Sequence, residues 1–507
     1  MAYLAISLFL LLTCVFSAFA EKRNVLIILA DDYGFENQAY NNTVCQTPHL
    51  NKLASHSVIF KHGYTAVSSC SPSRSSILTG LPQHQNGHYG LAHAFHHFQA
   101  FDQVKSLPVI LKNASIRTGI IGKKHVKPPS VFKFDYERTD EHYPMLQVAR
   151  NITHMKELVH EFLNVNDTRP FLLYVAFNDP HRCTANVELG EFCEMFGNGQ
   201  PGKGVIPDWK PIHYKPEDVE LPFFIQDTPA ARDEIAKQYT TISRMDQGIG
   251  LFMKELEQAG FSDNTLVIFT SDNGIPFPGA KTNLYEKGMG EPFLVSSPYH
   301  RERWGKESDA MASSLDIVPT VLDWFDVSFP DYKLFNEKVK LSGKSLLPAL
   351  EKEQPTWDTV FASHDFHEIT MYYPMRVMKH KNYRLIHNLN YRMPYPIALD
   401  IALSATMRDI LNRTEAHQKT GWFKTLDEYY YRDEWELFDV SKDPHELNNL
   451  VQDPQHLEIF QDMKKKLSSW QYETGDPWRC SPEGVYVDAG VYSKDPFCMS
   501  LLNAPPK

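Results

Sequence analysis

The sequence predicts an α/β protein in which helices flank a large sheet, with a smaller α+β domain at the C-terminal end. Two observations predict this fold. Over the first two-thirds of the chain, short apolar runs rich in β-branched residues alternate with stretches of helical periodicity, as is typical of a sheet enclosed by helices. From about residue 375 the chain changes to aromatic, basic and turn-rich segments, such as residues 429–438. We therefore expect a large domain over residues 21–375 and a smaller one over 376–507.

The start of the chain predicts a secretory signal peptide over residues 1–20. An apolar run ends at Ala18-Phe19-Ala20, a pattern typical of a cleavage site, and polar residues begin at Glu21. The run is too short to cross a bilayer with polar flanks on both sides. A buried N-terminal helix is the alternative. Since no later stretch is apolar enough to span a membrane, we expect a soluble protein without membrane contact.

Four apolar runs are predicted to be buried strands: residues 24–30, 117–122, 170–177 and 265–270. Each has a nearly continuous apolar centre, as strands covered on both faces require. Helical periodicity predicts helices near residues 47–57, 72–80, 150–165, 229–260 and 313–325.

Composition favours a globular enzyme. Hydrophobic residues make up 42% of the chain and aromatic residues 12%, which argues against disorder. The net charge of −11 does not indicate affinity for nucleic acid. Most of the 22 histidines would be charged at about pH 5 if their pKa values were ordinary, so an acidic compartment would favour binding of a polyanionic substrate.

Five Asn-x-Ser/Thr sites are typical of a glycoprotein: Asn41, Asn113, Asn151, Asn166 and Asn412.

The cysteines predict two local disulfides in an oxidising compartment, because the members of each pair lie close in sequence: Cys183 with Cys193, and Cys480 with Cys498. Apart from one cysteine in the signal peptide, Cys45 and Cys70 are left. They form a third bridge in one interpretation, and Cys70 is unpaired in the other.

Charged and metal-binding side chains follow each of the four predicted strands. The four segments are Asp31-Asp32-Tyr33-Gly34, Lys123-Lys124-His125, Asn178-Asp179-Pro180-His181 and Ser271-Asp272-Asn273-Gly274. Behind a single strand these are ordinary turn residues. In open α/β sheets, however, ligands bind beyond the carboxyl ends of the strands. Turn formation alone does not explain why all four strands are followed by charged or metal-binding residues. The sequence therefore predicts an active site at this edge of the sheet.

A hard cation is expected in that site. Asp31, Asp32, Asp272 and the amide oxygen of Asn273 form an oxygen-only set, which suits Ca²⁺ or Mg²⁺ rather than zinc. Three carboxylates that converge without a cation would repel one another.

The segment from Cys70 to Gly80 predicts a helix with an anion-binding start. Pro72 suits the first helical turn and Gly80 suits the end. Cys70 then lies at the helix N-terminus, where free N–H groups attract an anion. Arg74, one turn further, offers a guanidinium fork for a tetrahedral oxyanion. A capped helix with a buried or bridged cysteine is the alternative.

This segment resembles the sulfatase family motif Cys-x-Pro-Ser-Arg-x-x-x-Leu-Thr-Gly, with seven matches at Cys70, Pro72, Ser73, Arg74, Leu78, Thr79 and Gly80. The family's second motif, roughly Gly-Tyr-x-Thr-x-x-x-Gly-Lys-x-His, is similar to Thr118, Gly122, Lys123 and His125, with Ser115 and Ile116 in place of its Gly-Tyr. The resemblance implies an alkaline-phosphatase-like sulfatase fold, with a large mixed sheet in the catalytic domain.

Similarity to one branch of this family covers essentially the whole chain after the signal peptide, notably residues 80–87, 177–183, 270–278, 373–376 and 470–478. That branch removes the N-linked sulfate from terminal N-sulfoglucosamine of heparan sulfate. The resemblance therefore implies an enzyme that acts on sulfur–nitrogen bonds. It also implies that this enzyme reaches the lysosome through the secretory pathway. It also implies a homodimer and maturation by the formylglycine-generating enzyme.

The resemblance implies a chemistry as well. Cys70 is oxidised to formylglycine, whose hydrate attacks sulfur with one hydroxyl and expels sulfate with the other. Ca²⁺ would be held by Asp31, Asp32, residue 70, Asp272 and Asn273. Sulfate oxygens would be held by Arg74, Lys123 and Lys281, the last inferred from its position after the fourth strand. His125 would deprotonate the hydrate and His181 would protonate the leaving atom, although these two roles could be exchanged.

Two other functions remain open. An O-sulfatase for another sulfated sugar or an aryl ester would carry the same motifs. An inactive glycan-binding protein would keep the fold, with an intact thiol or a Cys45–Cys70 bridge. The side chains of His367, Glu368 and Arg376 are expected at the surface rather than against a sugar.

Overall fold

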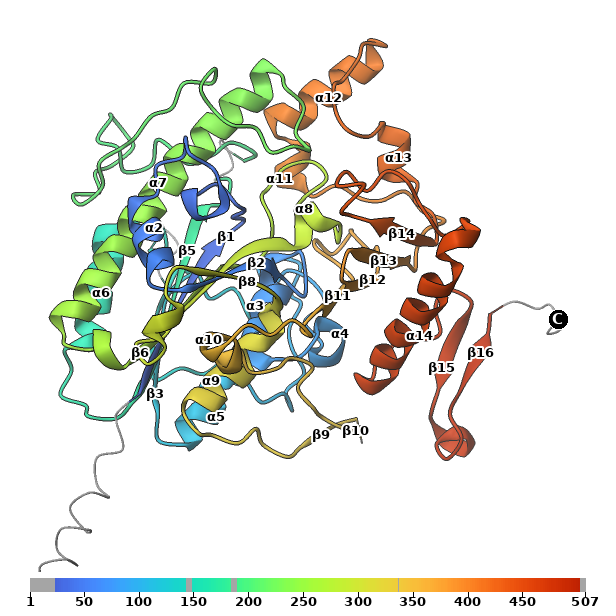
Figure 1. Cartoon of the computed structure of the whole chain (residues 1–507), viewed down its shortest axis with the longest axis horizontal. Coiled ribbons are helices and arrows are strands. Elements are labelled where there is room, and N and C mark those ends of the chain that lie inside the picture. The colour runs from blue at the N-terminus through green and yellow to red at the C-terminus, as the bar shows by residue number, and fades with distance from the viewer. Residues whose placement is uncertain (1–22, 143–147, 184–188, 336, 502–507) are drawn as a thin grey trace, which may run out of the picture.

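A computed structural model describes residues 23–142, 148–183, 189–335 and 337–501, so the predicted signal peptide lies outside the described residues. Figure 1 shows a large sheet with helices on both sides and a smaller group of strands and helices from the C-terminal part of the chain. The predicted α/β class, with its smaller α+β part, is confirmed. Within the described ranges, every helix is too short or too polar to cross a membrane.

The large sheet is mixed, and its eight strands follow the order β4-β3-β5-β1-β6-β7-β2-β8. The strands are β1 (Asn24–Asp31), β2 (Val58–Tyr64), β3 (Arg117–Gly122), β4 (Tyr136–Thr139), β5 (Phe171–Pro180), β6 (Thr265–Ser271), β7 (Gly290–Ser296) and β8 (Lys306–Ser313). β1 lies between β5 and β6 and runs parallel to both, whereas β7 runs antiparallel to β6 and β2. The four predicted strands are confirmed as β1, β3, β5 and β6.

Helices cover both faces of this sheet. Because side chains alternate along a strand, Val25 and Ile27 of β1 enter one core, whereas Leu26 and Ile28 enter the other. The core of Leu26 is covered by α2 (Pro48–Ser55), α6 (Ile152–Leu163) and α7 (Pro229–Gln258). The core of Val25 is covered by α3 (Cys70–Thr79), α5 (Leu107–Asn113) and α9 (Ile317–Trp324). Shorter helices are α4 (Gln83–Asn86), α8 (Glu286–Met289) and α10 (Leu347–Glu351).

The C-terminal part is built on an antiparallel sheet of β11 (Thr359–His364), β12 (Met375–His380), β13 (Tyr383–Asn388) and β14 (Trp435–Asp439). Its helices are α11 (Leu399–Ala402), α12 (Ala405–Glu415), α13 (Leu426–Tyr430) and α14 (Leu457–Glu473), the last packed on the sheet through Met463 and Leu467. Two-stranded pairs are β9 (Lys333–Leu334) with β10 (Glu337–Lys338), and β15 (Gly484–Val487) with β16 (Phe497–Ser500). The domain boundary after residue 375 stays a prediction; the four-stranded sheet already begins at β11.

Buried ion pairs hold the C-terminal part together. Arg376 of β12 is fully buried, and its guanidinium donates to Asp365 Oδ1 at 2.8 Å and to Asp476 Oδ2 at 2.7 Å. His367 is also buried, with Nδ1 at 2.8 Å from Ser69 Oγ. The expectation that Arg376 and His367 lie at the surface is therefore wrong, and two of their partners, Asp476 and Ser69, lie at least 100 residues away in the sequence.

We expect Arg376→Met to lower the free energy of unfolding by about 3–5 kcal/mol, because it leaves two buried carboxylates without their cation. Arg392→Met is the matched control, since Arg392 is exposed and its loss should change stability by no more than about 0.5 kcal/mol. Urea unfolding of the two variants measures the difference. Equal effects would contradict the assignment of a buried ion pair.

Several histidines are buried in the folded protein. Burial lowers the pKa of His84, His88 and His364 to about 3 each. These three side chains therefore stay neutral at about pH 5, contrary to the expectation for most histidines. The unfolded chain takes up protons on them near its ordinary pKa of about 6.5, but the folded chain does so only near 3, so stability falls as pH drops through that window.

We expect His88→Asn to reduce the loss of stability between pH 7 and pH 5 by about 2 kcal/mol, because pH 5 lies about 1.5 units below the unfolded pKa. Urea titrations at both pH values measure this. The exposed His56 provides the control His56→Asn, which should leave the loss unchanged. A His88→Asn protein that loses as much stability as its parent would refute the explanation.

Candidate active site

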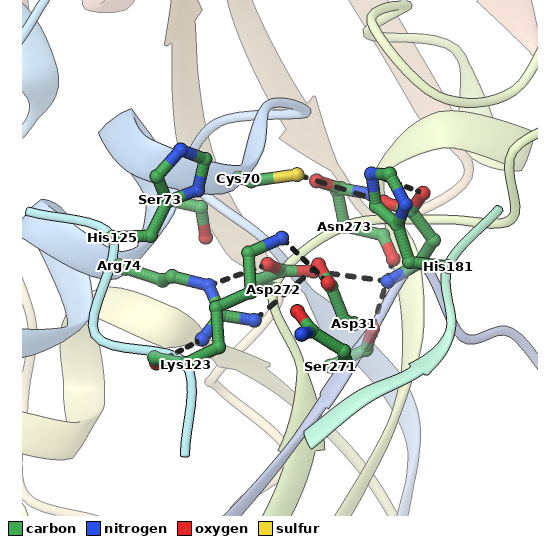
Figure 2. Close-up of polar contacts among 12 residues, drawn as sticks. Asp31, Cys70, Ser73, Arg74, Lys123, His125, His181, Ser271, Asp272 and Asn273 are labelled. Carbon is green, nitrogen blue, oxygen red and sulfur yellow. Dashed lines mark hydrogen bonds and ion pairs between the residues drawn. The ribbon is translucent and has the colours of Figure 1, made fainter. Parts of the chain in front are cut away.

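The carboxyl ends of four neighbouring strands bring the predicted side chains together at one edge of the large sheet (Figure 2). Asp31 ends β1, and Asp272 and Asn273 directly follow β6. Potential ligand atoms of four buried residues all lie within 4.8 Å of one another: Asp31, Asp32, Cys70 and His181.

Cys70 is the first residue of α3 and is buried among these groups. The helix ends at Gly80 in the left-handed conformation (φ 69°), where a Cβ would come within 2.6 Å of Leu341. Cys45 and Cys70 are both free, so the bridged alternative is wrong, whereas the two predicted local disulfides are present. Burial raises the pKa of the Cys70 thiol well above its ordinary value. An unmodified thiol here would be a weak nucleophile.

Arg74 and Lys123 supply positive charge beside the carboxylates. Arg74 Nε donates to Asp272 Oδ2 at 2.8 Å, and Nη2 lies 3.3 Å from Asp31 Oδ1. Lys123 Nζ donates to Asp31 Oδ2 at 2.5 Å. Burial alone would raise the pKa of Asp31, but Lys123, His181 and Arg74 hold it well below its usual range. Burial raises the pKa of Asp272 to about 7 in spite of Arg74.

Lys281 connects the site to the C-terminal part of the chain. Its Nζ donates to Asp32 Oδ2 at 2.8 Å and to Asp400 Oδ2 at 3.1 Å. Burial would lower the pKa of Lys281, but Asp32 and Asp400 hold it well above its ordinary value. The sequence located Lys281 only by its position after the fourth strand. Asp400, in α11, was missed because no motif marks it.

His181 has a defined tautomer. Its Nδ1 donates to the carbonyl of Arg182 at 2.7 Å, so in the neutral ring Nε2 carries the lone pair and accepts from Lys281 Nζ at 3.1 Å. The same Nε2 lies 3.5 Å from Asp32 Oδ2. Burial and the charge of Lys281 lower the pKa of His181. A proton taken up at Nε2 would lie beside the carboxylate of Asp32.

His125 lies across the site from His181, with Cys70 between them (Figure 2). Its Nε2 is 2.7 Å from Nδ1 of His93, a partner that the sequence did not predict. Burial, with the charge of Lys123, lowers the pKa of His125 well below its ordinary value.

Backbone strain occurs at three positions of the site. The non-glycine residues with left-handed conformations include Asp32 (φ 61°), His125 (φ 54°) and Thr282 (φ 70°), which follows Lys281. Each such residue costs about 1–3 kcal/mol and persists only where the surroundings hold it. For Asp32, the backbone N–H donates to Asp272 Oδ1 at 3.1 Å. The strained residues thus hold the carboxylate, a lysine and a histidine in fixed positions.

The site is compatible with a metal ion. Asn273 Oδ1 is buried without a hydrogen-bond partner among the described residues, and Asp31 Oδ1 has only the ion pair with Arg74 Nη2 at 3.3 Å. A buried acceptor without a donor is costly, and both oxygen types are ligands that Ca²⁺ and Mg²⁺ take. Both oxygens of Asp272 already accept hydrogen bonds, from Arg74 and from the backbone of Asp32, so its role as a ligand stays a prediction.

Two protein families match this sequence. Residues 23–327 match the sulfatase family, and residues 409–473 match the family described as N-sulphoglucosamine sulphohydrolase, C-terminal. This protein is a member of the sulfatase family, and the sulfatase fold that its motifs implied is confirmed.

Individual proteins and solved structures are also similar to this chain. Human N-sulphoglucosamine sulphohydrolase is 55% identical over 486 residues, which cover 96% of this chain and 96% of that protein. An ulvan-active sulfatase of Formosa agariphila is 24% identical and covers 90% of this chain and 76% of its own length. The solved structure of a 2-O GAG sulfatase has a TM-score of 0.64 at 19% identity and covers 91% of this chain and 94% of that one. The match at 19% identity shows the shared fold alone.

Proposed function

We propose that this protein hydrolyses the N-linked sulfate of terminal N-sulfoglucosamine in heparan sulfate. The observation that carries the proposal is the 55% identity to human N-sulphoglucosamine sulphohydrolase across 96% of both chains. The match of residues 409–473 to the C-terminal family of the same name supports it. The buried, unpaired Cys70 and its charged neighbours argue against an inactive glycan-binding protein.

Two groups complete the proposed site. Formylglycine made from Cys70 would supply an aldehyde hydrate, a better nucleophile than a buried thiol whose pKa is raised. Ca²⁺ would be held by Asp31, Asp32, residue 70, Asp272 and Asn273, and would supply the charge that offsets the carboxylates and the sulfate. Asn273 Oδ1 and Asp31 Oδ1, two buried oxygens that accept no hydrogen bond from the described residues, support this ligand set.

The surrounding side chains act on the sulfate and on the leaving atom. Arg74, Lys123 and Lys281 direct N–H donors to sulfate oxygens as charge develops on them. The sulfur–nitrogen bond breaks while sulfur bonds to an oxygen of residue 70, and His181 gives the leaving nitrogen a proton from Nε2. His125 takes the proton from the attacking hydroxyl. The second hydroxyl of the hydrate would then expel sulfate and restore the aldehyde, which water hydrates again. The net reaction converts sulfamate and water into amine and sulfate.

The protein acts in the lysosome, which it reaches through the secretory pathway, and it works as a homodimer. The formylglycine-generating enzyme converts Cys70 before folding is complete, since the folded chain buries this residue. The disulfides Cys183–Cys193 and Cys480–Cys498 support an oxidising compartment.

Purified secreted protein should release sulfate from N-sulfoglucosamine at the non-reducing end of a heparan sulfate oligosaccharide. Peptide mass mapping should find an aldehyde at residue 70, and Cys70→Ala should lower kcat by at least about 10³-fold, as loss of a nucleophile does. Cys45→Ala is the control, because Cys45 is the other buried free cysteine and should leave activity intact. An intact Cys70 thiol in active protein, or release of O-linked sulfate alone, would refute the proposal.

Calcium should stabilise the folded protein. At a calcium concentration 100 times Kd, the stabilisation expected from mass action is about 2.7 kcal/mol, measured as a rise in Tm that a chelator reverses. Asn273→Ala should weaken this calcium dependence, because it removes a buried oxygen without a donor. Asn390→Ala, which removes a half-buried amide elsewhere, should not. A Tm that is independent of calcium in the parent protein would exclude the cation site.

A further inference from the structure

Asp400 is a buried carboxylate whose presence the proposed reaction does not explain. It belongs to α11 and lies outside both family matches, which cover residues 23–327 and 409–473. A site for an anionic substrate gains nothing for sulfate binding from an extra negative charge. We infer that Asp400 accepts a hydrogen bond from the N–H of the sulfamate and so selects N-linked over O-linked sulfate. This inference rests on the proposed function.

Contacts fix the Asp400 carboxylate on the side of the proposed acid. Oδ1 accepts from the backbone N–H of Ile401 at 2.9 Å, and Oδ2 accepts from Lys281 Nζ at 3.1 Å. Oδ2 also lies 3.9 Å from His181 Nε2. Two atoms this far apart can both contact a single third atom at hydrogen-bond distances of about 2.6–3.2 Å. The atom that receives the proton of His181 can therefore also touch Asp400.

The chemistry of the leaving atom makes this contact selective. A sulfamate nitrogen carries one hydrogen, whereas the bridging oxygen of a sulfate ester offers only lone pairs. An ionised carboxylate accepts hydrogen bonds and cannot donate them. Asp400 is ionised: burial would raise its pKa, but Lys281, His181 and His367 hold it well below its usual range. An N–H gains a charge-assisted hydrogen bond, and an ester oxygen meets a repelling anion.

A purely structural role would have a different signature. If Asp400 only held Lys281 in place, its removal would impair N-linked and O-linked substrates alike, because both contain the same sulfate group. Discrimination by the leaving atom instead changes the ratio of the two activities. Sites built to bind a substrate N–H reject an analogue without it by about 10⁴–10⁵-fold.

The test compares N-sulfoglucosamine with glucose 2-sulfate, in which oxygen replaces the N–H group. Secreted full-length protein is measured as the parent, as Asp400→Ala and as Asp400→Asn. The parent should favour the N-linked substrate in kcat/KM, and both variants should lower that ratio by at least about 100-fold, mainly through loss on the N-linked substrate. Asp409→Asn, a carboxylate on neighbouring α12 that pairs with Arg413, should leave the ratio unchanged.

A second measurement needs no variant. N-methyl-N-sulfoglucosamine keeps the sulfur–nitrogen bond but lacks the N–H, and the parent protein should cleave it at least about 100-fold less efficiently than N-sulfoglucosamine. Equal losses on both substrates in the Asp400 variants, or full activity on the N-methyl compound, would overturn the inference while the proposed function stands. A parent protein that does not cleave N-sulfoglucosamine would overturn the proposed function and the inference together.

Discussion

The balance of charge around Asp31, Asp32 and Asp272 is the constraint on which the rest of the site depends. All three carboxylates are fully buried where central strands of the sheet end. Buried charges of one sign are tolerated only with partners of the other sign. Arg74 comes from α3 and Lys123 follows β3, so the balance is met only when separate segments converge. The same convergence places Cys70 beside the carboxylates.

We assign different roles in the proposed reaction to the large sheet and to the C-terminal part of the chain. In the proposed function, the large sheet supplies the groups that act on the sulfate, which every sulfatase substrate shares. Lys281 follows a strand of that sheet and pairs with Asp400 of the C-terminal part. In the proposed function, the ion pair of Lys281 with Asp400 joins a sulfate-binding residue to a segment next to the leaving atom. Substrate choice can then change through the C-terminal part while the sulfate chemistry stays the same.

Local patterns made much of this architecture predictable. Buried central strands give continuous apolar runs, and Pro72 and Gly80 mark the limits of α3. The strand ends indicated most of the site because their polar residues follow directly in the sequence. Asp400 was not predictable, since it reaches the site only through the packing of the C-terminal part. Arg376 was assigned to the surface because arginine is usually exposed, and its partner Asp476 lies 100 residues away.

A crystal structure of the secreted protein would reveal both the cation and the chemical state of residue 70. We predict density for one divalent cation in contact with the carboxylates of Asp31 and Asp32, and an oxygen-bearing residue 70 without sulfur. Sulfur at residue 70, with the lysine ammonium groups as the only cations between these carboxylates, would contradict it.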